Sequence, residues 1–123
     1  MGYAEIRRYH RAKVGPGVMI QFKARDRFFL GLNVVSLGGG GCSVKISPTL
    51  AASLHPEDLL SRMFLQHPRL PSLALQGKIS WIRGKQPGMG EDAVLLGIEF
   101  TDPDEAFVAT LDAYVIEFEN AAP

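Results

Sequence analysis

Apolar and polar residues alternate in short runs along most of the chain, and each run predicts a half-buried β-strand. The first run covers residues 18–23, and a charged turn at 24–27 separates it from a second run at 28–35. A third run, residues 42–46, ends at Ser47-Pro48. We therefore expect the first two runs to form a β-hairpin, with the third strand following a glycine-rich segment.

The middle of the chain shows weaker periodicity. Residues 50–60 are compatible with a helical turn and residues 62–66 with a short strand. Two prolines in the segment 67–71 favour a loop. Residues 73–81 then predict a longer strand, in which Gly77 is a candidate bulge. A final strand is expected at 93–100, after a turn rich in Gly and Pro.

A helix is predicted after the last strand. Asp102 is a candidate N-cap, Pro103 suits the first helical position, and Glu105 stands where a capping box places a carboxylate. Apolar residues then recur at three- and four-residue spacing and form one stripe: Phe107, Leu111, Tyr114, Val115 and Phe118. About six strands followed by one helix predict an all-β protein, a six-stranded antiparallel β-barrel with a C-terminal α-helix packed on its side.

Length and composition set the class of protein. A chain of 123 residues is expected to fold as one domain. Cys42 is the only cysteine, so an internal disulfide is excluded. The first residues lack the apolar core of a signal peptide, and no apolar run approaches the length of a membrane span. We therefore expect a cytoplasmic protein without membrane insertion.

The net charge of zero hides a polarity along the chain. Residues 1–27 carry seven Lys and Arg against two carboxylates, whereas the chain from residue 91 onward carries nine carboxylates and no Lys or Arg. A basic head favours an anionic ligand held by the N-terminal segment, although the two ends are equally able to neutralise each other across the fold. A neutral chain offers no broad basic face, so nucleic-acid binding is not expected.

Residues 1–16 are polar and basic, and the sequence Gly15-Pro16-Gly17 marks their boundary with the rest of the chain. They are predicted to form an arm or switch loop before the first strand. Residues 17–123 would form the barrel and the helix, giving one domain overall.

The residues give little support to catalysis. The three histidines are scattered and have no metal-ligand spacing with one another or with Cys42. Ser36 lies in no nucleophile-elbow pattern, and the glycine run at 38–41 lacks the Lys-Ser/Thr of a phosphate-binding loop. Neither an enzyme, a metal site nor a bound cofactor is predicted.

Three short elements follow one another along the chain. Arg7 and Arg11 form an Arg-x-x-x-Arg element just before the first predicted strand. Ser36 and Gly39 then fit an Asp/Asn-x-Ser-x-x-Gly element, and the segments 77–83 and 96–100 precede the predicted helix. In this order and spacing, the elements resemble the PilZ domain, a bacterial receptor module for cyclic di-GMP, over nearly the whole chain.

The resemblance implies that arginines bind the ligand. Arg7 and Arg11 would contact its guanines and phosphates, and Arg8 would add electrostatic attraction. The chemistry is suitable, because a planar guanidinium matches the adjacent O6 and N7 acceptors of guanine and also stacks on a purine. A solvated charge cluster is the alternative interpretation of the same three arginines.

The resemblance also implies contacts from the barrel. Ser36 would hydrogen-bond the ligand, Gly39 would let the backbone approach closely, and Trp81 with Arg83 would line the same site. For the glycine run an ordinary turn is the alternative, and for Trp81 a place in the core.

One position departs from the family pattern. Val34 stands where the family has Asp or Asn, and the nearest amide is Asn33. Adjacent side chains of a strand face opposite sides, so Asn33 is a candidate substitute only if a bulge shifts the register.

Two functions remain open at this point. The first is a cyclic di-GMP receptor that changes its N-terminal arm on binding and thereby alters the surface shown to an unidentified partner protein. The alternative is a degenerate PilZ domain that acts as a ligand-independent adaptor in motility, pilus or chemotaxis machinery, an interpretation that Val34 favours. The sequence leaves the oligomeric state open.

Overall fold

A computed structural model describes residues 11–14, 17–84 and 94–121 of the chain. Its elements are β1 (Arg11–Lys13), β2 (Met19–Ala24), β3 (Arg27–Gly38), β4 (Gly41–Ile46), α2 (Pro48–Ala51), β5 (Leu59–Gln66), β6 (Leu75–Arg83), β7 (Val94–Phe100) and α3 (Glu105–Ala121).

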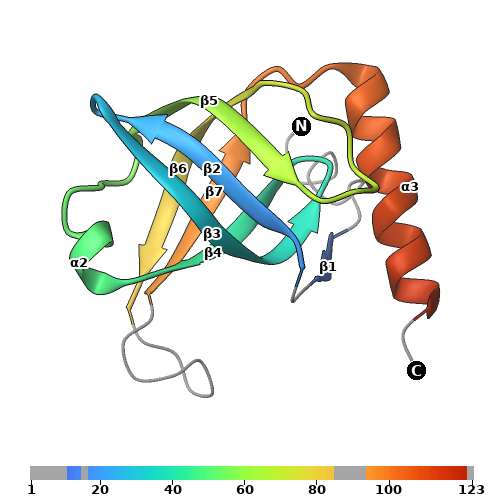
Figure 1. The fold of residues 1–123 in the computed structure, drawn as a ribbon, viewed down its shortest axis with the longest axis horizontal. Coiled ribbons are helices and arrows are strands. Elements are labelled where there is room, and N and C mark those ends of the chain that lie inside the picture. Colours follow the sequence, from blue (N-terminus) through green and yellow to red (C-terminus); the bar gives the residue numbers. More distant parts are fainter. Residues whose placement is uncertain (1–10, 15–16, 85–93, 122–123) are drawn as a thin grey trace, which may run out of the picture.

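Strands β2 to β7 form a closed antiparallel barrel (Figure 1). Their order is β3-β2-β5-β6-β7-β4, and pairing of β4 with β3 closes the sheet on itself. The inward-facing side chains fill the barrel, and Phe22, Phe29, Leu37, Val44 and Ile98 are among the buried residues. The predicted six-stranded barrel with a C-terminal helix is confirmed.

The short strand β1 lies within the segment for which the sequence predicts an arm. Arg11 pairs with Gly38 and Lys13 with Ser36, so β1 extends the sheet beside the last part of β3. The N–H of Val14 donates to the carbonyl of Val35 at 2.8 Å. Residues 1–10 lie outside the described residues, so the division into an arm and a barrel stays a prediction.

The hairpin between β2 and β3 turns at Arg25 and Asp26, which have φ angles of 51° and 62°. Two consecutive residues with positive φ are typical of the type I′ turn, whose twist suits a two-residue hairpin. The hairpin predicted from the alternating pattern is therefore present, with its turn inside the expected charged segment.

Gly77 is not a bulge, contrary to the sequence prediction. It pairs in register with Leu60 on one side and Phe100 on the other, and the register shifts fall between Leu60 and Met63 of β5 and after Ile79 of β6. A Cβ at Gly77 would lie 2.6 Å from the carbonyl oxygen of Glu99. The glycine is needed because β6 and β7 pack closely at this point.

Helix α3 begins two residues later than predicted. The Oδ1 atom of Asp104 accepts hydrogen bonds from the N–H groups of Ala106 at 2.7 Å and Phe107 at 3.3 Å. Asp104 is therefore the N-cap, whereas Asp102 has a φ of 45° and lies in the preceding turn.

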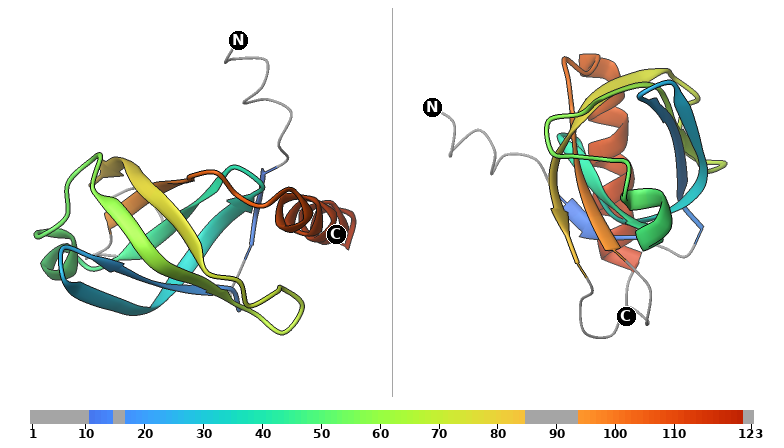
Figure 2. Two further views of the ribbon diagram at one scale, coloured as in Figure 1. Left: turned by 90° about the horizontal axis from the view of Figure 1, so that it is seen from above. Right: turned by 90° about the vertical axis from the view of Figure 1, so that its left-hand side faces the viewer.

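Helix α3 packs on the barrel where β1 joins β3 (Figure 2). Phe107, Leu111, Tyr114 and Val115 are buried as expected, while the side chain of Phe118 lies outside the described residues. Across the described segments, neither helix has the length and apolarity needed to cross a membrane.

Asp58 ties the β2–β3 turn to the loop before β5. The Nε atom of Arg25 lies 3.1 Å from both carboxylate oxygens, and the N–H of His55 donates to Oδ2 at 2.8 Å. Burial acts to raise the pKa of Asp58, but the hydrogen bonds from Arg25 and His55 and the charge of Arg25 outweigh it and hold the pKa below its usual value.

Removing this carboxylate is expected to destabilise the fold in a pH-dependent way. Because the folded-state pKa is depressed, ionised Asp58 stabilises the native state above its unfolded pKa, and this contribution is lost as the pH falls through the folded pKa. We expect Asp58→Asn to lower the free energy of unfolding by about 1–2 kcal/mol at neutral pH. Urea unfolding at neutral pH and below pH ~4 measures the effect, and the difference from wild type should shrink in acid. Asp26→Asn, in the same turn, is the control and should stay near wild type at both pH values.

Candidate functional site

Two predicted site residues, Ser36 and Trp81, lie in one row across the outer face of the barrel. Ser36 of β3 is opposite Ser43 of β4, Ser43 is opposite Gly97 of β7, and Gly97 is opposite Trp81 of β6. Directly paired residues of neighbouring strands face the same side of a sheet. Ser36 and Trp81 therefore share one face although they are separated by two intervening strands.

Asn33 and Arg83 lie in the next row of the same face. Asn33 is opposite Lys45, Lys45 is opposite Leu95, and Leu95 is opposite Arg83. On β4, β7 and β6 this row is two residues from the first, which is the spacing of side chains on one face. We call the surface formed by these two rows the β3–β4–β7–β6 face; in Figure 1, β6 and β7 lie behind β2 and β5.

A bulge brings Asn33 and Ser36 to this common face. The pairing of β3 with β4 shifts by one residue between Val34 and Ser36. Without the shift, residues three apart would face opposite sides. Asn33 is exposed, whereas Val34 is only 2% exposed and belongs to the barrel core. The register shift that Asn33 needs in order to share a face with Ser36 is therefore present. Val34, at the position where the family has Asp or Asn, faces inward.

The hydroxyl groups of Ser36 and Ser43 lie 2.5 Å apart. One of them donates to the other, which leaves the second O–H for another acceptor. Ser43 is buried and Ser36 is half-buried, so donation from Ser43 leaves the more accessible Ser36 hydroxyl free to donate outward. This arrangement provides a hydrogen-bond donor at the surface.

Trp81 lies on the outer face and not in the barrel core. Its indole covers Gly97 so closely that a Cβ there would meet the ring at 2.1 Å. The guanidinium carbon of Arg83 lies 4.3 Å from the ring centroid, in cation–π contact. Both side chains keep some exposure. Together they form a flat surface with a positive charge on it.

Gly39 lies in the tight turn that joins β3 to β4. The flanking Gly38 and Gly41 pair with each other, and the carbonyl of Gly40 accepts the N–H of Phe100 at 3.0 Å. Gly39 is buried within this turn, and its contact with a ligand stays a prediction.

The predicted arginines are placed only in part. The backbone of Arg11 pairs with Gly38 next to the Ser36 row, while the side chain of Arg11 and all of Arg7 and Arg8 lie outside the described residues. The N-terminal segment thus joins the sheet beside Ser36.

Two residues of the face were missed at the sequence level. Lys45 is exposed between Asn33 and Leu95, and Ser43 is the partner of Ser36. Their alternation with the buried Val44 already indicated that they face outward. Their neighbours were not predictable, because these depend on the β3–β4 register and therefore on the bulge.

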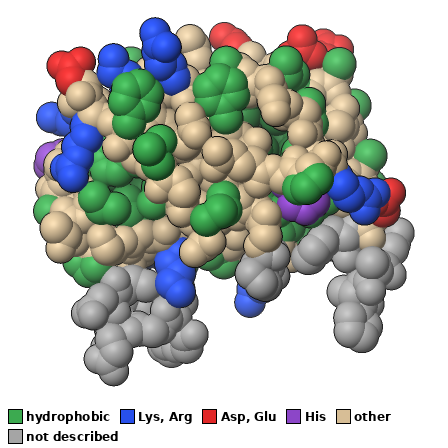
Figure 3. Space-filling model, in the orientation of Figure 1, with side chains coloured by type: hydrophobic (Ala, Val, Ile, Leu, Met, Phe, Trp, Pro, Cys, Tyr) green, Lys and Arg blue, Asp and Glu red, His purple; other side chains and the backbone are tan. Residues whose placement is uncertain are grey.

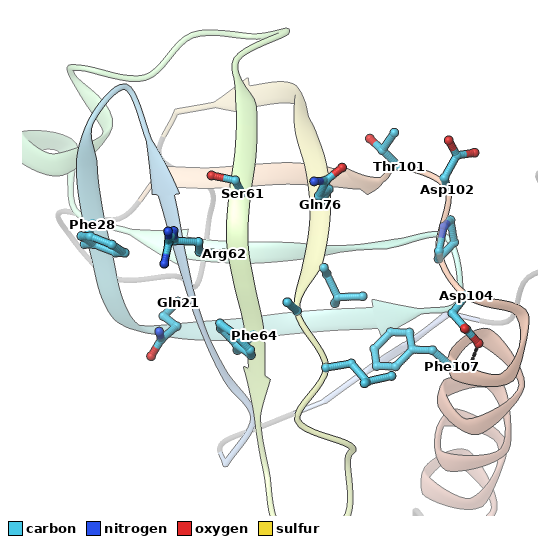
Figure 4. A pocket seen from close by; sticks show the side chains of 14 residues that line it. Gln21, Phe28, Ser61, Arg62, Phe64, Gln76, Thr101, Asp102, Asp104 and Phe107 are labelled. Atoms are coloured by element: carbon cyan, nitrogen blue, oxygen red, sulfur yellow. Dashed lines mark hydrogen bonds between the residues drawn. The ribbon is translucent and has the colours of Figure 1, made fainter.

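A cavity of about 780 Å³ lies on the other side of the barrel, over β2, β5 and the start of β6 (Figure 4). None of the predicted site residues that the structure describes lines it. Within the part of the chain that the structure describes, no group of three or more His, Cys, Asp or Glu residues is arranged to hold a metal ion.

The fold and the face together define a class of protein: a closed antiparallel barrel with one helix beside it and a row of polar and aromatic side chains on one wall. A family model described as PilZ domain matches residues 5–117. The chain belongs to the PilZ domain family, and this match indicates no catalytic family.

Solved structures show the same fold at low sequence identity. The PilZ domain of YcgR from Escherichia coli, determined with c-di-GMP, is 16% identical with a TM-score of 0.75, covering 93% of this chain and 92% of that one. The K. pneumonia MrkH–c-di-GMP complex is 10% identical with a TM-score of 0.77, and the Bacillus subtilis inhibitor of motility MotI/DgrA is 14% identical with a TM-score of 0.76. Matches cover 93% and 95% of this chain but only 52% and 53% of those two proteins, so it spans about half their length. A search of the curated proteins found no relative.

Proposed function

We propose that the protein is a cytoplasmic cyclic di-GMP receptor whose ligand lies on the β3–β4–β7–β6 face and is enclosed by the N-terminal arginines. One observation carries this proposal: two adjacent rows hold Asn33, Ser36, Trp81 and Arg83 on one face, beside the strand that continues from the arginine segment. Membership in the family and the c-di-GMP complexes of two structural neighbours support the choice of ligand.

Each group on the face suits one part of such a ligand. The Trp81 ring and the Arg83 guanidinium offer stacking surfaces for a guanine, and Lys45 adds a positive charge for a phosphate. The free hydroxyl of Ser36 donates to a phosphate or carbonyl oxygen. Arg7 and Arg11 supply guanidinium groups for the guanine edges and the phosphates, with Arg8 raising the local positive potential.

Asn33 takes the role that a carboxylate would otherwise fill. Its side-chain oxygen is able to accept hydrogen bonds from the N1 and N2 donors of guanine, but it carries no charge. A hydrogen bond to a charged group contributes about 1.5–3 kcal/mol and a neutral one about 0.5–1.5 kcal/mol, so we expect binding roughly tenfold weaker than with an aspartate.

Ligand binding would order the N-terminal arm against the face. Because β1 pairs with β3 and also contacts α3, a change in the arm would reach the surface formed by β1 and α3. An unidentified partner protein would respond to this surface, and no further cofactor is required.

Calorimetric titration of the purified protein with cyclic di-GMP tests the proposal. We expect saturable binding, and Arg7→Ala and Arg11→Ala should each weaken it roughly 10- to 100-fold, because each removes a charge-assisted contact. Arg69→Ala is the matched control, since Arg69 pairs with Glu117 of α3 and does not belong to the proposed site. No detectable heat at high micromolar ligand contradicts the proposal.

The adaptor function remains the second candidate, because the position that carries an acid in the family is a core valine here. Asn33→Asp separates the two functions. A modest gain over measurable wild-type affinity supports the receptor, whereas binding that appears only in the variant supports a domain that has lost its ligand.

A further inference from the structure

The wall of the barrel opposite the proposed ligand site carries an open groove over β2, β5 and the start of β6, which we call the β2–β5 groove (Figure 4). In the cyclic strand order, β2 and β5 are opposite β4 and β7. The groove therefore lies on a different wall of the barrel from the β3–β4–β7–β6 face.

Apolar side chains from three segments converge on this groove. Phe28 comes from β3, Phe64 from β5 and Leu73 from the loop before β6. Phe28 is 52% exposed and Leu73 is 45% exposed. Single exposed apolar residues are ordinary, but a group of them around one hollow marks an interaction surface. Figure 3 shows hydrophobic side chains exposed at several places across this side of the molecule.

Charges of opposite sign lie toward the two sides of the groove. Arg62 lies near Phe28 and Phe64, whereas Asp102 and Asp104 lie at the start of α3 (Figure 4). All three are exposed, and Arg62 forms no ion pair with any of the described residues. Phe28 and Arg62 thus lie toward one side of the groove, Asp102 and Asp104 lie toward the other, and further apolar side chains line the space between them.

We infer that the β2–β5 groove is the interface of a symmetric homodimer. A twofold axis places the same patch of both copies face to face in opposite directions. Arg62 of each copy then meets Asp102 and Asp104 of the other, and the exposed side chains of Phe28 and Leu73 pack against the other copy. In a second copy, the twofold symmetry places an opposite charge against each charged side of the groove. A different partner would need one acidic and one basic group at matching positions. The net charge of zero adds no long-range repulsion between copies.

The oligomeric state of the ligand-free protein tests this inference, which goes beyond the proposed receptor function and does not depend on it. Sedimentation velocity from low to high micromolar protein should show a monomer–dimer equilibrium. Arg62→Glu should raise the dimer dissociation constant roughly 10- to 100-fold, because two attractive contacts become repulsive. Arg62→Lys keeps the charge and should dimerise nearly as wild type. A wild-type protein that stays monomeric, or an Arg62→Glu variant that dimerises normally, overturns the inference.

Mixing two variants tests the twofold pairing itself. Arg62→Glu and Asp102→Lys should each dimerise poorly, since each creates like-charge contacts in its own homodimer. An equimolar mixture should form a dimer of one copy of each, because the glutamate introduced in one copy would then face the lysine introduced in the other, while the native Arg62–Asp102 contact remains on the other side. Thermal melting confirms that both variants are folded. A mixture as monomeric as its components overturns the symmetric arrangement.

Discussion

Val34→Asp is expected to destabilise the barrel by about 3–5 kcal/mol, because it places a carboxylate in an apolar interior without a partner. Val34 is 2% exposed and pairs with Val44, which is fully buried. The substitution introduces the acid that the family pattern has at this position, yet here the side chain faces the core. Urea unfolding should show a large fall in the midpoint or no folded baseline at all.

The adjacent substitution Asn33→Asp is the control for this prediction. Asn33 is exposed on the opposite side of the strand and lies across from Lys45. We expect its free energy of unfolding to stay within about 0.5 kcal/mol of wild type. If Val34→Asp were as stable as Asn33→Asp, residue 34 would not face the core, and the register of β3 before the bulge would be wrong.

The alternation of apolar and polar residues was sufficient to predict the barrel. Inward-facing positions such as Ile20, Phe22 and Val44 recur every second residue, and this period directly reflects the pleat of a strand. The strand β1 was not recognised, because Arg11–Lys13 contributes only three residues and its pairing depends on the distant end of β3.

Two sequence predictions, the N-cap of α3 and the bulge at Gly77, were wrong because they depend on local backbone conformation. Asp102 and Asp104 are both good N-caps by residue type, and the choice between them depends on the turn in which Asp102 adopts a positive φ. Gly77 was interpreted as a bulge because a glycine in a strand indicates either a bulge or a close approach, and the sequence does not distinguish the two.

The sequence proposes residues for the candidate site but does not predict how they are arranged. The motif resemblance selected Ser36, Trp81 and Arg83, whereas their common face depends on two register shifts, one in β3 and one in β6. The shift in β3 falls within the apolar pair Val34-Val35, where nothing in the residue types marks it. Lys45 was missed for the same reason, since its neighbours follow from that register.

Gly97→Val is expected to displace Trp81 from the proposed site. A Cβ at residue 97 would lie 2.1 Å from the indole, so the ring has to leave its position over β7. We expect a loss of about 1–3 kcal/mol in the free energy of unfolding, as for other overpacked positions. Loss of a stacking surface should also weaken cyclic di-GMP binding roughly tenfold or more, if the ligand binds where we propose.

Intrinsic fluorescence measures this displacement directly, because Trp81 is the only tryptophan of the chain. The emission maximum of folded Gly97→Val should shift to longer wavelength as the ring enters water, and the quenching that we expect from bound cyclic di-GMP in the wild type should weaken in parallel. Gly84→Val is the matched control, since a Cβ at Gly84 meets no atom of the described residues within 4 Å. Unchanged emission in Gly97→Val would contradict the placement of the indole over Gly97. If the emission shifts but the ligand affinity is unchanged, the indole lies over Gly97 as described, but Trp81 does not belong to the binding site.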